Sequence, residues 1–349
     1  MNSSTPAPGW QELMLSNLPA SPAQKRLALC VALTLFVVFV IAAGPLSTRP
    51  LARLNGFVPA YGTAIFVNDL ITAALLFGQF SIVRSRALLA LASGYLLTAF
   101  VAIPWALTLP GVFAPGGLLG AGRQSTAWLY VLWHAGFALF AIIYALLKDS
   151  DPFRPLSQGS IRAVILASVG LVAALVCGMT VLVTAGDALM PQLLLDTVWL
   201  TSLWTYLAAL MIALVFAGLA LLWLRHRSLL DLWLMVVLCA YAIEIALISF
   251  PVAARFTFGW YAGRVYGLFS SSLVLLILLK EITILYSQLL RAVLAQHRER
   301  EVRLMTGEAV SASIVHEVKQ PLSAMTTSAD AALRWLDRAA PDLDEARAA

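Results

Sequence analysis

Two groups of residues in this sequence have side chains that can do chemistry. The first is near the C-terminal end, where Glu317, Lys319, Pro321 and Leu322 follow His316. An imidazole nitrogen can act as a nucleophile or a base, and a neighbouring carboxylate can orient the ring or take its proton. A lone histidine on a helix is usually an ordinary surface residue, so its assignment depends on the segment around it.

The second group consists of polar or amphipathic side chains inside long apolar runs. They are Asn68, Asp69, Trp133, His134 and Glu244. An Asp at the centre of a bilayer costs about 2.5–3.5 kcal/mol on insertion scales, so each ionisable group needs a partner or a wet cavity. We take all five as candidate sensor residues. The alternative for each is a packing role, as a hydrogen bond between neighbouring helices.

The composition points to lipid as the solvent for most of the chain. Hydrophobic residues make up 61% of the 349 residues and charged residues only 12%, whereas soluble domains have about 45–50% and about 25%. The net charge of +5 comes from residues at the ends of apolar runs and in the tail, without a basic patch interleaved with aromatics, which argues against nucleic-acid binding. Three cysteines without a CxxC pair give no support for a disulfide framework or a zinc site.

Eight apolar runs are long enough to cross a bilayer as helices. They are 27–44, 62–80, 86–104, 126–147, 161–185, 202–224, 230–250 and 265–288. The predicted fold is therefore all-α: a polytopic bundle of about eight transmembrane helices, followed by a cytoplasmic helical segment. The longest outer loop, 105–125, is apolar and rich in Gly and Pro, which favours an interfacial connector or a cover over a cavity.

Lys and Arg in the short loops predict the orientation, because cytoplasmic loops carry the excess. Nine lie on one side and five on the other, the five being Arg49, Arg53, Arg123, Arg255 and Arg264. The side with nine also carries the basic tail, so both termini are predicted to be cytoplasmic. The first 24 residues contain no early apolar run, so no cleavable signal peptide is expected.

The tail carries a helical apolar stripe. Its members recur at three, four and seven residues: Ile314, Val318, Met325, Ala329, Ala332 and Leu336. His316 falls off this stripe and is expected to face water, and Pro321 is expected to kink or loosen the helix. A second helix is predicted near Pro341. Together with the two resemblances described next, this predicts a cytoplasmic tail (1–24), a membrane sensor domain (25–288), a helical linker (289–305) and a dimerisation and phosphoacceptor segment (306–349).

The stretch Pro59–Lys148 resembles the membrane-associated sensor domains of the MASE group, most closely the fourth type. The matching runs are VPAYGTAIFVNDLITAALLFGQF, RALLALASGYLLTAF, PGVFAPGGLLGAGRQSTAWLYVLWHAGF and YALLKD. The resemblance covers the first four spans well and the last four more loosely. It implies a sensory input module attached to a kinase or cyclase, and it does not imply a ligand.

The tail segment SIVHEVKQPLSAM resembles the H-box of HisKA dimerisation and phosphoacceptor domains. The resemblance implies that His316 is the phosphorylated histidine and Glu317 the acidic residue that follows it. Pro321 and Leu322 match the family's Pro-Leu pair, and Lys319 stands where relatives often have Asn. In such domains a neutral imidazole attacks the γ-phosphoryl group in line, while a nucleotide site with its metal supplies positioning and charge.

These resemblances predict a sensor histidine kinase of a two-component system in a bacterial inner membrane. We expect ATP and Mg²⁺ to bind a downstream domain absent from this chain, so that the chain itself binds no cofactor or metal and is inactive alone. The expected partners are a second copy through the tail helices, a response regulator and the lipid bilayer. The alternatives are a transporter or channel with a helical cytoplasmic tail, and a scaffold that dimerises through its tail.

Overall fold

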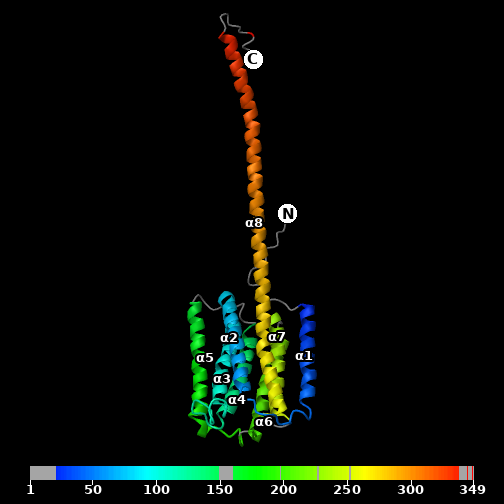
Figure 1. Ribbon diagram of the computed structural model, residues 1–349, viewed down its shortest axis with the longest axis vertical. Coiled ribbons are helices and arrows are strands. Elements are labelled where there is room, and N and C mark those ends of the chain that lie inside the picture. Colours follow the sequence, from blue (N-terminus) through cyan, green and yellow to red (C-terminus); the bar gives the residue numbers. More distant parts are fainter. Residues whose placement is uncertain are drawn as a thin grey trace. The chain divides into compact units, whose positions relative to one another are not determined.

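The computed structural model describes residues 21–148, 160–196, 198–225, 228–250 and 253–337, with Asp344 and Ala348, apart from the side chains of residues 307–309 and 312. Every regular element in these ranges is a helix (Figure 1). In chain order they are α1 (Pro22–Ala42), α2 (Phe57–Val83), α3 (Arg86–Thr108), α4 (Ser125–Leu147), α5 (Ile161–Thr184), the 3₁₀ turn η2 (Asp187–Leu189), α6 (Ser202–Leu224), α7 (Leu229–Ser249) and α8 (Phe258–Leu336).

Eight of these helices are long and apolar enough to cross a membrane, which confirms the predicted all-α fold and the number of spans. Three predicted boundaries were wrong by five to seven residues: α1 begins at Pro22, α2 at Phe57 and α8 at Phe258. Helix α3 also continues through residues 105–108, which were predicted to be loop. At the three starts, Pro, Gly or aromatic residues resemble a loop, although the first turn of a helix tolerates them.

Serine side chains mark where the odd-numbered helices begin. Ser21, Ser85, Ser160 and Ser228 precede α1, α3, α5 and α7, and each hydroxyl accepts a hydrogen bond from a backbone N–H of the first turn. Such a cap satisfies one of the donors that the first turn leaves free. The serines therefore define the starts of these helices more sharply than hydropathy does.

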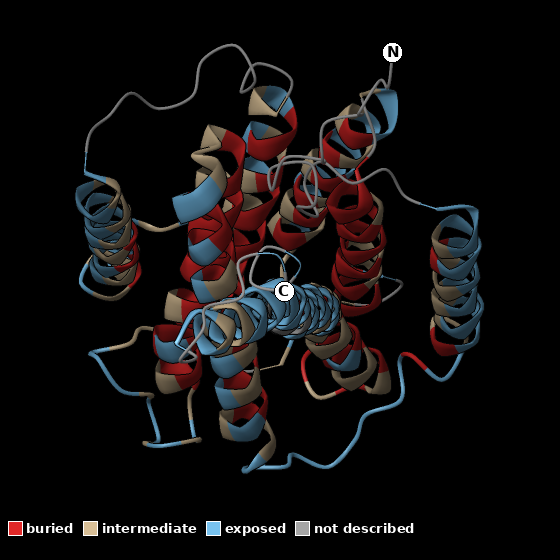
Figure 2. Ribbon diagram, turned by 90° about the horizontal axis from the view of Figure 1, so that it is seen from above, coloured by how far each residue is buried: buried red, intermediate tan, exposed pale blue. Residues whose placement is uncertain are grey.

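The most buried helices of the membrane unit, residues 1–281 as far as they are described, are α3 and α7. Helices α1 and α5 lie at its two edges and expose most of their surface (Figures 1 and 2). Cys30 on α1 and Cys177 on α5 are exposed, and Cys239 is half-buried. All three are free thiols.

The loops joining α1 to α2, α3 to α4, α5 to α6 and α7 to α8 gather at one end of the bundle, called here the predicted outer face. Isolated β-bridges pair Pro50 with Thr257 and Trp199 with Ala254. The Gln124 side chain accepts hydrogen bonds from the backbone of residues 193 and 194. Asp196 accepts from the N–H groups of residues 199 and 198, which hold the pKa of its carboxyl below the ordinary value.

At the opposite end of the bundle, Asp231 ties the start of α7 to the end of α4. Its carboxylate accepts hydrogen bonds from the Tyr144 hydroxyl at 2.7 Å, the Lys148 ammonium at 2.6 Å and the Ser228 backbone N–H at 2.8 Å. Because Asp231 is almost fully buried, these contacts supply the partners that its charge requires.

Residues 282–337 form a unit of their own, consisting of the C-terminal part of α8. The helix runs through Pro321 without interruption. The whole predicted stripe except Ala332 is exposed along this single helix. The predicted second helix near Pro341 lies outside the described residues.

Candidate functional site

A buried ion pair forms the centre of the membrane unit. Arg264 Nη1 on α8 donates to Glu244 Oε1 on α7 at 2.9 Å, and the two side chains are 4% and 1% exposed. The sequence identified Glu244 as a residue in need of a partner, but it placed Arg264 in an outer loop. Arg264 in fact lies within α8, because that helix begins seven residues earlier than predicted.

Four aromatic rings surround the Arg264 guanidinium. Its carbon lies 4.8 Å from the Tyr130 ring centroid, 5.0 Å from Trp260, 5.1 Å from Trp105 and 5.7 Å from Tyr61. A cation above an aromatic face gains about 0.5–2 kcal/mol, with the larger values where water is excluded. Helices α2, α3 and α4 each contribute a ring, so Arg264 links α8 to three other helices.

His134 on α4 approaches the same carboxylate. Its Nδ1 lies 2.9 Å from the Tyr130 carbonyl oxygen, which can only accept, so Nδ1 carries a hydrogen. Nε2 lies 3.5 Å from Glu244 Oε1. Without a proton on Nε2, a lone pair faces the carboxylate. With a proton there, the contact between Nε2 and the carboxylate is attractive. The ring stacks on Tyr130 and Tyr241, with centroids 3.7 and 4.6 Å away. The His134 ring therefore lies beside the Glu244 carboxylate and between two tyrosine rings.

Asp69 is the second buried carboxyl group. Thr98 Oγ1 on α3 and Ser271 Oγ on α8 each donate to it at 2.6 Å. The neighbouring Asn68 donates from Nδ2 to Ser272 Oγ at 2.8 Å. Asp69 has no cationic partner within salt-bridge distance in the described ranges, so hydroxyl groups alone stabilise it.

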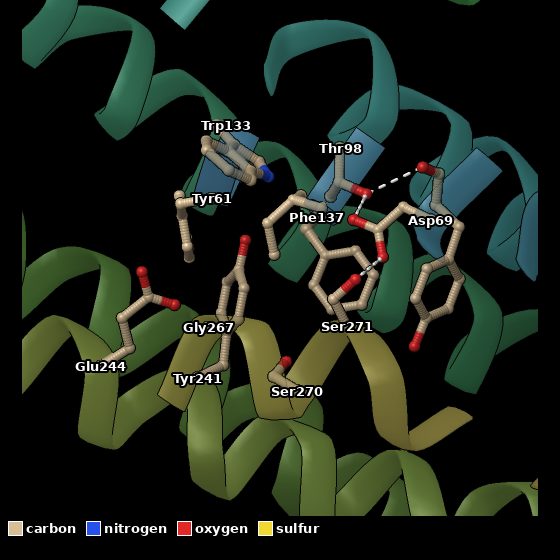
Figure 3. Close-up of a pocket in the computed structure, with 12 residues that line it drawn as sticks. Tyr61, Asp69, Thr98, Trp133, Phe137, Tyr241, Glu244, Gly267, Ser270 and Ser271 are labelled. Carbon is tan, nitrogen blue, oxygen red and sulfur yellow. Dashed lines mark hydrogen bonds between the residues drawn. The ribbon is translucent and has the colours of Figure 1, made fainter. Parts of the chain in front are cut away.

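The two carboxyl groups line one cavity (Figure 3). Asp69 lies at one end of the drawn residues with Thr98 and Ser271, and Glu244 lies at the other. Among the polar atoms of the described chain, Trp133 Nε1 and the Tyr95 and Tyr241 hydroxyls have no hydrogen-bond partner, and all three side chains line this cavity. The space holds about one water molecule, and polar walls of this kind favour its binding.

Glycines allow α8 to approach α7 closely at this site. Gly259, Gly263 and Gly267 recur every four residues along α8. A Cβ on Gly263 would lie 2.9 Å from Ile248 Cγ1, and one on Gly267 would lie 2.7 Å from Glu244 Oε2. Small residues at this spacing let transmembrane helices pack closely. The spacing was readable from the sequence and was not used in the prediction.

The second candidate site is on the tail. His316 and Glu317 are exposed, and the Gln320 side-chain nitrogen lies 3.3 Å from His316 Nε2. Lys319, Pro321 and Leu322 are also exposed. Exposure does not distinguish His316 here, because almost all described residues of this helical segment are exposed. The roles of these five residues stay predictions.

These features define an integral membrane protein whose helical bundle encloses an ion pair, a second carboxyl group and a small polar cavity. Comparison with protein families matches residues 52–286 to MASE4, a membrane-associated sensor, integral membrane domain. The chain belongs to this family, and the match covers α2 to α7 and the first part of α8. No HisKA domain was detected. No curated protein matches the chain, and no solved structure does.

The match confirms the predicted membrane sensor domain of the fourth MASE type, and it extends the resemblance across all the later spans. Of the five candidate sensor residues, the structure brings Asp69, Trp133 and Glu244 to one cavity, with His134 beside Glu244. Asn68 instead joins α2 to α8, which fits the alternative packing role. Arg264, Thr98 and Ser271 were missed.

Proposed function

We propose that this chain is the sensor and phosphoacceptor part of a histidine kinase, in which His316 takes a phosphoryl group from ATP. The membrane domain belongs to a sensor family whose members typically sit in signalling enzymes. The observation that carries the finer proposal is the segment SIVHEVKQPLSAM, which lies on the same helix that begins in the sensor domain.

The chemistry at the tail supports this role. A nucleotide bound to a separate domain can reach the exposed imidazole of His316, which can then attack it. Glu317 is the next residue in the chain. A carboxylate there can orient the ring or take its proton as the nitrogen–phosphorus bond forms and the bond to ADP breaks. ATP and Mg²⁺ belong to a separate catalytic domain in this proposal, and the phosphoryl group then passes to an aspartate of a response regulator.

The apolar stripe supports a homodimer. Ile314, Val318 and Met325 are exposed on one helix, and water-exposed apolar stripes of this spacing are buried by packing on other helices. We propose that a second copy covers the stripe, and that the protein lies in a bacterial inner membrane with both termini in the cytoplasm. Membership of a sensor family favours this reading over a transporter with a helical tail.

The test uses the full chain in lipid nanodiscs, supplied with an isolated histidine-kinase catalytic domain and labelled ATP. We expect acid-labile label on the wild type and none on His316→Gln. His297→Gln is the matched control, since His297 is an exposed histidine of the same helix outside the H-box-like segment. Label that persists in His316→Gln, or that is lost in His297→Gln, contradicts the assignment.

A further inference from the structure

A second cavity, with free space for about one water molecule, is lined by residues near the ends of helices at the predicted outer face. Its polar and aromatic lining includes Trp105, Tyr130, Trp204, Arg255, Trp260 and Arg264. The lining comes from α3, α4, α6, α7 and α8 and from the loops before α6 and α8. It shares none of its lining residues with the Asp69 cavity.

Some of the buried donors that line this cavity have no acceptor among the described residues, although Trp204 Nε1 donates to Ser249 Oγ and Thr126 Oγ1 to Thr108 Oγ1. Arg255 is 8% exposed, so its guanidinium is largely withdrawn from water. Arg264 Nη1 donates a hydrogen bond to Glu244. Arg264 Nε and the Tyr130 hydroxyl have no hydrogen-bond partner in the described part of the chain. Buried polar groups are normally hydrogen-bonded, so a set of unpaired donors around one space indicates a missing acceptor.

The charges of the lining residues also favour an anion in this cavity. Two guanidinium groups line the cavity and none of its lining residues is acidic. Burial, together with the neighbouring charges of Arg264 and Arg53, lowers the pKa of Arg255 to about 10. Thr126, Trp204 and Trp260 lie in the first turns of α4, α6 and α8, whose positive ends therefore face this region. An anion would relieve the repulsion between the arginines.

We propose that this cavity binds a small monovalent anion, a halide or a short oxyanion such as formate, between Arg255 and Arg264. The free space holds about one water molecule, which excludes a large ligand. A guanidinium donates two parallel hydrogen bonds to a carboxylate, and aromatic walls exclude competing water. The site goes beyond the proposed kinase role and does not depend on His316.

Arg264 gives the site a connection to the rest of the bundle. Arg264 lines this cavity and also bonds Glu244, which lies beside His134. An anion competes with Glu244 for the charge of Arg264 and so weakens the bond between these two side chains. Anion binding thus acts on α4, α7 and α8 together.

The test measures the melting temperature of the full chain in nanodiscs by tryptophan fluorescence. Sodium chloride and sodium formate are titrated against sodium gluconate at constant ionic strength, since gluconate is too large for the cavity. We expect a saturable rise with chloride or formate and none with gluconate. No saturable rise, or an equal rise with gluconate, overturns the proposal.

Variants locate the site. Arg255→Gln is expected to weaken anion binding about tenfold or more, because it removes a charged donor, while Arg255→Lys keeps part of the affinity. Arg49→Gln is the matched control, an exposed arginine of the same face that does not line the cavity. Ala127→Leu adds volume at a residue that lines the cavity, leaves both arginines in the sequence, and should also abolish the rise. Wild-type affinity in both Arg255→Gln and Ala127→Leu overturns the assignment.

Discussion

At the scale of single residues, the membrane unit depends on how Arg264 is neutralised. Its guanidinium lies among four aromatic rings and has one carboxylate partner within the described residues, Glu244. Removing one member of a buried ion pair leaves the other charge uncompensated, which costs more than the pair itself contributes. Glu244 is therefore the residue whose neutralisation should most disturb the bundle.

We expect Glu244→Gln to lower the free energy of unfolding by about 3–5 kcal/mol, because Arg264 then stays buried without a counter-charge. Urea or SDS titration of the purified chain, followed by tryptophan fluorescence, measures the change. Glu299→Gln is the control: Glu299 pairs with Arg303 at 2.6 Å, but the two side chains are 64% and 77% exposed. Exposed pairs contribute about 0–1 kcal/mol, so equal losses in the two variants would contradict the prediction.

Sequence reasoning identified Asp69, His134 and Glu244 because an ionisable side chain in an apolar run is costly wherever it points. It could not identify their partners. Thr98 and Ser271 are ordinary residues within spans, and their contact with Asp69 depends on which helices are neighbours. Hydropathy gives the number of spans and carries no information on their pairing. Arg264 was missed because it lies close to a span end, where an arginine resembles a loop residue.

At the scale of the helix, the glycines of α8 decide how closely it approaches α7. The Cβ of an alanine at position 267 would lie 2.7 Å from Glu244 Oε2 and 2.9 Å from Glu244 Cδ. Neither helix can yield freely, because Glu244 is bonded to Arg264 one turn earlier on α8. The close packing and the ion pair therefore depend on each other.

Gly267→Ala is expected to destabilise the protein by about 1–3 kcal/mol through overpacking. Gly170→Ala on α5 is the matched control, because a Cβ at Gly170 meets no atom within 4 Å. There the gain in helix propensity should leave stability unchanged or slightly higher. Thermal unfolding of the two variants in the same lipid decides the matter, and a Gly267→Ala variant as stable as Gly170→Ala would refute the close-packing argument.

The helical elements themselves were largely predictable, because an apolar run of about 20 residues in lipid must satisfy its backbone internally. The errors fall at ends such as Phe258–Gly263, where aromatic and glycine residues are common both in loops and in first turns. The capping serines before α1, α3, α5 and α7 carried usable information on those starts. The tail helix was predicted from its stripe, although the stripe alone does not say what covers it.

At the scale of the whole molecule, we expect the tail to pair with that of a second copy. Val318 belongs to the apolar stripe, and Ser323 lies on the opposite side of the helix by the 100° step per residue. In a background with Cys30, Cys177 and Cys239 replaced, Val318→Cys should form disulfide-linked dimers under mild oxidation. Ser323→Cys should do so far less. Equal cross-linking at both positions, or at neither, would argue against dimerisation through this stripe.

The same helix that carries Arg264, Gly267 and Ser271 continues to His316, so a rotation of α8 is the simplest signal that one unit can pass to the other. Inserting one alanine after Gln296 turns every later residue by about 100° about the helix axis, whereas inserting seven turns them by about 700°, within about 20° of two full turns. With a catalytic domain and labelled ATP supplied, the one-residue insertion should shift His316 labelling several-fold, and the seven-residue insertion should restore it to near the wild-type level. If both insertions leave labelling unchanged, the angular position of the tail does not carry the signal. If both abolish it equally, the length of this segment matters rather than its rotation, and the coupling between the buried ion pair and the tail must take another form.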